Sequence, residues 1–181
     1  MTGAAGGEHW DVVVVGAGSA GCALAARLAD AGRRVPVLEA GADHLAFRLE
    51  SGAVLVGDHV LGRGTSVVTH PEGDVVAYLT SLRRVHDLGP AALYCGHGPE
   101  LTVDPAAVLA YYTAHRAHRE QQLLDALAGG PSTVDELVAT VYAAVPQALW
   151  PAAAQSTRAT LAKLTAEGRV RPEAGETVGL A

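Results

Sequence analysis

A glycine-rich motif directly after a short apolar run is the feature that most constrains this chain. The run is Asp11–Val15, and the motif Gly16-Ala-Gly-Ser-Ala-Gly21 matches G-x-G-x-x-G. A brief β-branched run that ends at a glycine indicates a buried strand rather than a helix. Residues 20–31 are rich in Ala and Leu, and a second apolar run at 35–38 ends at Glu39. This order of strand, glycine turn, helix and strand predicts a dinucleotide-binding βαβ unit.

Each glycine of the motif has a mechanical role. Gly16 permits the tight strand-to-helix turn, Gly18 lets a pyrophosphate approach the backbone, and Gly21 lets helix and strand pack closely. The helix N-terminus then offers free N–H groups to the phosphates. Glu39 lies where an acid accepts hydrogen bonds from ribose hydroxyls. These four residues are the cofactor-binding candidates, and the alternative is a βαβ scaffold that binds no ligand.

The same segment resembles a known family over residues 9–42. The stretches Asp11–Cys22, Ala25–Leu28 and Leu38–Gly41 are similar to the N-terminus of the glucose–methanol–choline family of FAD oxidoreductases. The resemblance implies FAD as a cofactor, with the four candidate residues facing its ADP part. Pro36 lies inside the second predicted strand, and because proline donates no ladder hydrogen bond it predicts an edge strand or relaxed selection.

A hairpin is predicted next, and a glycine turn follows it. Residues 43–49 alternate apolar and polar side chains, Ser51-Gly52 signals a turn, and 53–56 form a second apolar run. That pattern is typical of two paired strands. Gly57-Asp58-His59 comes directly afterwards, so the turn presents an acid at a strand end.

A helix and another strand lead to a second polar loop. Residues 74–87 carry apolar side chains at helical spacing, and 92–94 read as a strand. The tight loop Gly96-His97-Gly98-Pro99 follows that strand and carries a histidine.

Three motifs in this part resemble a second family. Gly57–Gly62, Tyr94–Pro99 and His115-Arg116 before a long helix are similar to metallo-β-lactamase-fold hydrolases with a C-terminal winged helix. That group includes endoribonucleases, esterases and thioesterases, and the resemblance covers residues 43–171. It implies that Asp58 corresponds to a carboxylate that bridges two zinc ions, and that His97 corresponds to a terminal histidine ligand.

The chain departs from that family where the metal ligands are concerned. The family's first metal motif, H-x-H-x-D-H, matches none of the eight histidines, and Ala40 stands where a further ligand histidine is expected. The N-terminal half of the αββα sandwich is also missing. Zinc sites use at least three protein ligands, whereas Asp58 and His97 supply two. We therefore predict weak or absent zinc binding, no catalytic residues and little or no hydrolysis.

The other histidines provide no clear third ligand. His59 is adjacent to Asp58, so the two side chains diverge, and His70 lies on a loop before a proline. His115 and His118 share a helix face at a spacing able to bind metal. Their charged neighbours, which favour a solvated helix face instead, are Arg116, Arg119 and Glu120.

A winged helix is predicted at the C-terminus. Gly129-Gly130-Pro131 ends the long helix, and either Ser132 or Thr133 can begin the next one with a capping box. A third helix at 151–167 and two short strands around a turn complete the unit. Such units often bind nucleic acid. The third helix and the wing offer only four cations, so a packing or dimerisation role is favoured. These cations are Arg158, Lys163, Arg169 and Arg171.

Charge and composition limit the partners. The formal net charge of −6 makes general nucleic-acid binding unlikely. Two isolated cysteines favour a reducing cytoplasm, and the lack of a run of about 20 apolar residues predicts no membrane span. Half of an αββα sandwich exposes an apolar face, so self-association to a homo-oligomer is expected unless other strands cover it.

The sequence thus predicts an α/β chain with three parts. A βαβ dinucleotide-binding fragment (1–42) joins a partial αββα metallo-β-lactamase fold (43–118), and a winged helix (119–181) follows. Three functions stay open: an incomplete metal-dependent hydrolase, acting on a small-molecule or RNA substrate only if active, an FAD-dependent oxidoreductase, or a non-catalytic fusion product.

Overall fold

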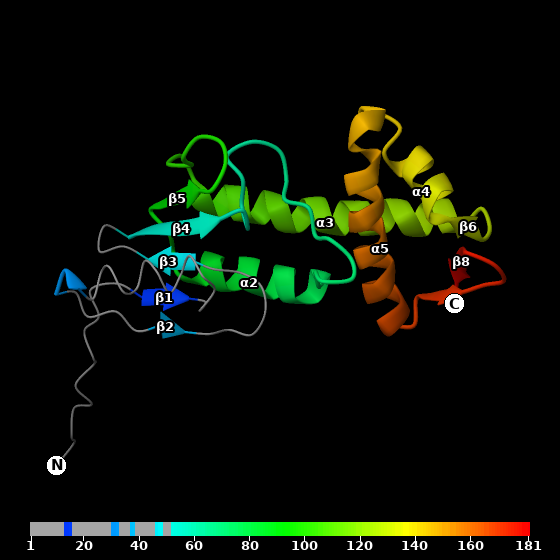
Figure 1. Cartoon of the computed structure of the whole chain (residues 1–181), viewed down its shortest axis with the longest axis horizontal. Helices are drawn as coiled ribbons and strands as arrows, with labels where there is room; N and C mark the ends of the chain where they lie inside the picture. The colour runs from blue at the N-terminus through cyan, green and yellow to red at the C-terminus, as the bar shows by residue number, and fades with distance from the viewer. Residues whose placement is uncertain (1–12, 16–29, 33–36, 39–45, 49–51) are drawn as a thin grey trace, which may run out of the picture. The chain divides into compact units, whose positions relative to one another are not determined.

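A computed structural model describes residues 13–15, 30–32, 37–38, 46–48 and 52–181 (Figure 1). The chain divides into two compact units, one formed by Met1–Arg63 with Asp87–Ala106 and the other by Gly64–His86 with Ala107–Ala181. The boundaries predicted after residues 42 and 118 do not coincide with the limits of these units, and they stay a prediction.

The first unit contains a five-stranded sheet of order β2-β1-β3-β4-β5. Its strands are β1 (Val13–Val15), β2 (Val37–Leu38), β3 (Ala46–Arg48), β4 (Ala53–Gly57) and β5 (Ala92–Cys95). β1 pairs with β2 in parallel, which is the pairing that the βαβ prediction requires. β3 pairs antiparallel with both β1 and β4, which confirms the hairpin, and β4 pairs with β5 in parallel.

The two edge strands of this sheet are β2 and β5. β2 is the edge strand on one side, which agrees with the prediction from Pro36, although Pro36 itself lies outside the described residues. At the other end, Leu93 of β5 forms an isolated antiparallel bridge with Leu101, with a backbone hydrogen bond of 2.9 Å in each direction. Val54 and Leu93, on the paired strands β4 and β5, are fully buried.

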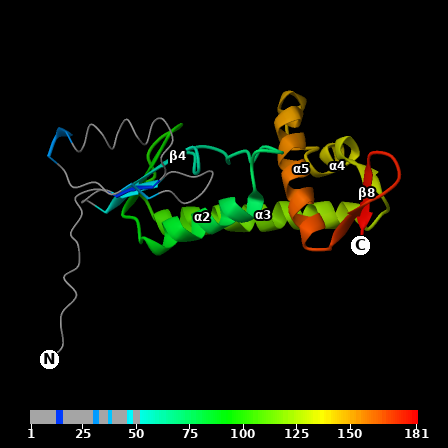
Figure 2. The same cartoon turned by 60° about the horizontal axis from the view of Figure 1, so that its bottom comes forward.

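The second unit begins with two helices that run side by side (Figures 1 and 2). They are α2 (Val75–Asp87) and α3 (Pro105–Leu127). The Asp74 carboxylate accepts hydrogen bonds from the backbone N–H groups of Val76 and Ala77, at 2.6 and 3.1 Å, and so caps the N-terminus of α2. The side chains that α2 buries recur at helical spacing: Val75, Tyr78, Leu82 and Val85.

The winged helix is present as predicted, with one additional strand. Its remaining elements are β6 (Ser132–Thr133), α4 (Val134–Val141), η1 (Gln147–Leu149), α5 (Trp150–Ala166), β7 (Val170–Pro172) and β8 (Thr177–Leu180). β6 was not predicted, and it makes the wing a three-stranded sheet of order β6-β8-β7. Of the two caps left open by the sequence, Thr133 forms the capping box with Glu136. The core of this part consists of Leu123, Leu127, Leu137, Leu161, Leu164 and Val170.

The face of α3 around His115 is not the solvated face that its charged residues predict. Arg116 is only 8% exposed. Its guanidinium lies 4.9 Å from the ring centroid of Tyr78 and donates to the backbone carbonyl of Ser66. An aromatic ring and a carbonyl therefore take the place of water around this cation. His115 lies inside α3 rather than before it, and burial, followed by the charges of neighbouring cations, lowers its pKa.

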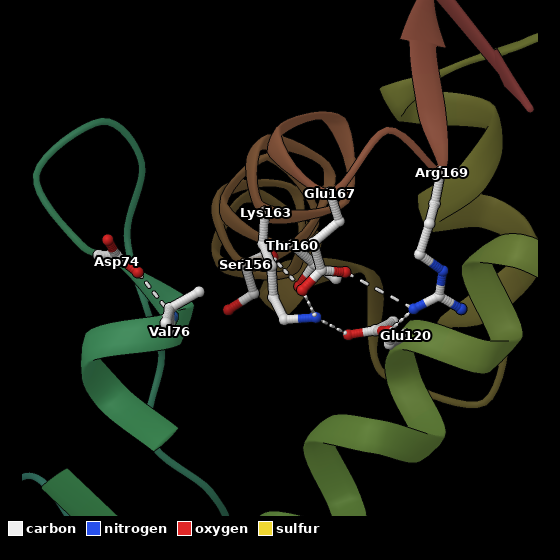
Figure 3. A network of polar contacts seen from close by, with 8 residues as sticks. All are labelled: Asp74, Val76, Glu120, Ser156, Thr160, Lys163, Glu167 and Arg169. Carbon is white, nitrogen blue, oxygen red and sulfur yellow. Dashed lines mark hydrogen bonds and ion pairs between the residues drawn. The ribbon is translucent and has the colours of Figure 1, made fainter. Parts of the chain in front are cut away.

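Glu120 is likewise an internal ion-pair partner rather than a surface charge. Its carboxylate accepts from Lys163 Nζ at 2.6 Å and from Arg169, and Lys163 also contacts Glu167 at 2.9 Å (Figure 3). The Lys163 and Glu120 side chains are 12% and 17% exposed. This Glu120 cluster, defined as Glu120, Lys163, Glu167 and Arg169, links α3 to α5 and to the start of the wing.

Candidate functional site

Asp58 and His97 meet at one end of the sheet. β4 and β5 are parallel neighbours with Gly57 opposite Cys95, so the loops that follow both strands leave from the same edge. Asp58 directly follows β4, and His97 lies two residues after β5. Their side chains approach to 2.5 Å between Asp58 Oδ1 and His97 Nδ1, although 39 positions separate them in sequence. The structure therefore brings together the two residues that the sequence singled out as metal ligands.

Backbone hydrogen bonds fasten the two loops to each other. Gly96 N donates to the carbonyl of Gly57 at 2.8 Å, and Gly62 N donates to the carbonyl of His97 at 2.9 Å. The strand register shifts between Leu55 and Gly57, just before the acid. Such an irregularity at a strand end redirects the side chain that follows it. Backbone hydrogen bonds between the two loops thus help to position the Asp58–His97 pair.

Close packing explains two of the glycines in the motifs around Asp58 and His97. A Cβ atom on Gly96 would lie 2.5 Å from Asp58 Oδ1, in the place of the carboxylate. A Cβ atom on Gly62 would overlap the backbone oxygen and nitrogen of Pro99. Both positions therefore need a residue without a side chain so that the loops can touch. The repeated glycines beside the acid and the histidine were the available signal, but their contact partner was not visible.

The pair is open to solvent, with the Asp58 and His97 side chains 61% and 78% exposed. The nearby Cys95 is half-buried, and burial together with the charge of Asp58 raises the pKa of its thiol.

No third donor joins the pair in the described part of the chain. His59 is only 5% exposed and belongs to the interior, whereas Asp58 beside it faces solvent, as predicted for adjacent residues. Among the described residues, no group of three or more His, Cys, Asp or Glu side chains is placed to hold a metal ion. Two donors fit part of one coordination sphere, and they do not fit a two-zinc hydrolytic centre.

The predicted cofactor-binding residues Gly16, Gly18, Gly21 and Glu39 lie outside the described residues. The structure does describe the strands on either side of the motif, β1 and β2, as parallel neighbours.

Two family profiles match the chain. That of the FAD binding domain matches residues 11–102, half of the chain. The chain belongs to this FAD-binding family. The second profile, the Beta-lactamase associated winged helix domain, matches residues 133–177, which hold α4 and α5.

Curated relatives are β-lactamase-like proteins. The chain is 35% identical over 132 residues to the Beta-lactamase-like protein 2 homolog of Drosophila melanogaster, which covers 71% of this chain and 44% of that protein. It is 40% identical over 114 residues to the Atrochrysone carboxyl ACP thioesterase of Aspergillus chevalieri, covering 58% and 35%. The chain thus spans less than half the length of these relatives.

Solved structures show the same fold. A metallo-beta-lactamase family protein from Thermus thermophilus superposes with a TM-score of 0.66 at 24% identity, over 81% of this chain and 55% of that one. A Beta-lactamase domain protein from Burkholderia ambifaria gives a TM-score of 0.66 at 25% identity, over 76% and 44%.

The FAD binding domain match thus extends over the whole five-stranded sheet, from β1 to β5, and the metallo-beta-lactamase family structure shares the fold of most of the chain. None of the described helices combines the length and the apolar character that a bilayer span requires.

Proposed function

We propose that the chain is an incomplete metallo-β-lactamase-fold hydrolase that binds one divalent ion, such as zinc, weakly through Asp58 and His97. The observation that carries the proposal is the 2.5 Å approach of Asp58 Oδ1 to His97 Nδ1 at the exposed ends of two parallel strands. Carboxylate oxygen and imidazole nitrogen are ordinary zinc ligands. Two donors leave most of the coordination to water, so hydrolysis is slow or absent.

The expected affinity follows from the number of ligands. A complete structural zinc site contributes about 10–16 kcal/mol, so two of four ligands give roughly 6 kcal/mol and a Kd on the order of tens of micromolar. We expect calorimetric titration of the full chain with zinc to show about one weak site. Asp58→Asn and His97→Gln should each abolish it, whereas His118→Gln, which removes an exposed histidine on α3, should leave it unchanged.

Two outcomes would overturn this proposal. Two zinc ions per chain that survive dialysis would show that a complete centre exists. Equal zinc binding by the wild type, Asp58→Asn and His97→Gln would show that the pair is not the site. Because one relative is named as an ACP thioesterase, a thioester is the appropriate substrate. Its hydrolysis should stay near the uncatalysed rate, and any residual rate should require zinc and Asp58.

A second candidate function is FAD binding, favoured by the family match over residues 11–102 and by the parallel pairing of β1 and β2. FAD added to the full chain should show quenched flavin fluorescence and remain bound through gel filtration. Gly18→Val should abolish binding because its side chain would block the pyrophosphate. An oxidoreductase needs in addition a domain that encloses the flavin ring. A chain that stays colourless and leaves flavin fluorescence unchanged would exclude this function.

A further inference from the structure

A groove of about 430 Å³ lies between α2 and α3, and neither Asp58 nor His97 lines it. Leu79 and Leu82 of α2 and Leu109, Ala110 and Ala114 of α3 form its apolar walls. The helices on either side run next to each other in both views (Figures 1 and 2). Its volume lies in the range of small-molecule sites, which are mainly apolar with a few polar groups that fix orientation.

Small side chains of α3 border the groove. Ala110, Ala114 and Ala117 lie on successive turns of that helix and leave space beside the leucines of α2. Elsewhere along the helix pair, the Arg116 guanidinium of α3 lies over the Tyr78 ring of α2, and both side chains are buried. Buried contacts therefore hold the two helices together, while the alanines leave the hollow between them.

The ionisable residues that line the groove are all basic. Its lining contains two basic residues, Arg83 and His86, which lie one turn apart on α2, and no acidic residue. Arg83 is exposed and forms no ion pair within the part of the chain that the structure describes. In a chain with a net charge of −6, a cation left without an acid beside an apolar wall is complementary to an external carboxylate.

We propose that this groove binds an aliphatic carboxylate. Its hydrocarbon chain lies along the leucine and alanine walls, and its carboxylate pairs with the Arg83 guanidinium. The bidentate geometry of arginine suits a carboxylate, and burial of the methylene groups provides the apolar part of the binding free energy.

The test compares three ligands with the same twelve-carbon alkyl group, added to the full-length protein below their micelle concentrations or solubility limits and followed by calorimetry. Dodecanoate should bind, dodecanol should bind at least about fivefold more weakly, and dodecyltrimethylammonium more weakly still. Arg83→Gln should weaken dodecanoate by at least about fivefold and bring it close to dodecanol. The matched control is Arg84→Gln, which removes the neighbouring exposed arginine that does not line the groove and should leave the affinity unchanged.

A second pair of variants tests the location without changing charge. Ala114→Leu fills the groove and should reduce dodecanoate binding about tenfold, whereas Ala106→Leu changes an exposed alanine of the same helix outside the groove and should have no effect. Circular dichroism establishes that both variants fold.

Three results would overturn the proposal. One is equal affinity for dodecanoate and dodecanol with no effect of Arg83→Gln, which would leave a merely apolar surface. Another is unchanged binding in Ala114→Leu, which would place the ligand elsewhere. The third is a wild-type chain that binds no dodecanoate; if that chain also forms a dimer in gel filtration that Ala114→Leu disrupts, the occupant of the groove is a second copy.

Discussion

Two pairs of an acid and a basic group in this chain have nearly the same separation and different surroundings. Asp58 and His97 approach to 2.5 Å with side chains that are 61% and 78% exposed. Glu120 and Lys163 approach to 2.6 Å with side chains that are 17% and 12% exposed. The loops that carry the first pair are joined by backbone hydrogen bonds, and the second pair belongs to the cluster that connects α3, α5 and the start of the wing. Short distance therefore says little about role, and the surroundings decide it.

Solvent explains the difference. An exposed pair gains little from its attraction because water screens both charges. In the Glu120 cluster, burial alone would lower the pKa of Lys163, but hydrogen bonds and charges from Glu120 and Glu167 outweigh it and raise that pKa. Lys163 therefore stays charged and paired at neutral pH. The exposed pair is available for a ligand, whereas the buried cluster stabilises the fold.

The largest effect should come from the backbone contact that supports the exposed pair. Gly62→Ala would drive a methyl group into the main chain at Pro99, which neither loop can avoid by rotating a side chain. We expect a loss of about 3 kcal/mol in the free energy of unfolding, measured by urea denaturation. Gly129→Ala is the control, because its Cβ would meet only a carbonyl at 3.4 Å. Equal stability of the two variants would contradict the loop packing.

Removing the acid of the buried cluster should have the next largest effect. Glu120→Ala leaves Lys163 partly buried without its main partner, and we expect a loss of about 2 kcal/mol in the same measurement. Asp125→Ala on the same helix should cost well under 1 kcal/mol, on the order of an exposed hydrogen bond to Gln121. If the two variants are equally stable, the cluster does not stabilise the fold.

The corresponding change in the exposed pair should be nearly neutral. Asp58→Ala is expected to alter the free energy of unfolding by less than about 0.5 kcal/mol, because both partners stay solvated when separated. Urea denaturation in the presence of a chelator makes the measurement independent of metal. A loss comparable to that of Glu120→Ala would abolish the contrast between the two pairs.

The smallest effect concerns Glu136, a fully solvated acid whose carboxylate is held by hydrogen bonds. Backbone and side-chain hydrogen bonds from Thr133 lower the pKa of Glu136. Its contribution is therefore complete above the ordinary glutamate pKa and is lost as pH falls through the lowered folded value. Glu136→Gln keeps an acceptor for Thr133 but does not titrate, so its melting temperature should fall less on acidification than that of the wild type.

The adjacent exposed acid provides the comparison for this experiment. Asp135→Asn lies in the same first turn of α4 but outside the capping box. Its melting temperature should follow the wild type on acidification. A Glu136→Gln variant with the same acid dependence as the wild type would show that the capping hydrogen bond does not hold in solution.

Much of the fold followed from local patterns. The hairpin, the helix at 74–87, the strand at 92–94 and the capping box of α4 were each encoded by residues within one or two turns of each other. The meeting of Asp58 with His97 followed from the family motifs, and the parallel pairing of their strands explains it.

What the sequence did not predict depends on contacts between distant segments. The Glu120 cluster joins positions 43 and 49 residues apart, and the stack of Arg116 on Tyr78 joins α3 to α2. Charged residues at helical spacing look alike whether water or a tyrosine ring surrounds them. The strand β6 has two residues, too few for a periodic signal.

The bridge between Leu93 and Leu101 has a consequence for how this chain behaves at high concentration. β5 ends the sheet, and an outer strand normally presents a row of unpaired N–H and C=O groups to which a foreign strand can add. Here Leu101 occupies both backbone groups of Leu93 at the centre of that row. An incoming strand would have to displace a segment of the chain's own backbone, so this side of the molecule resists the edge-to-edge pairing that begins amyloid growth.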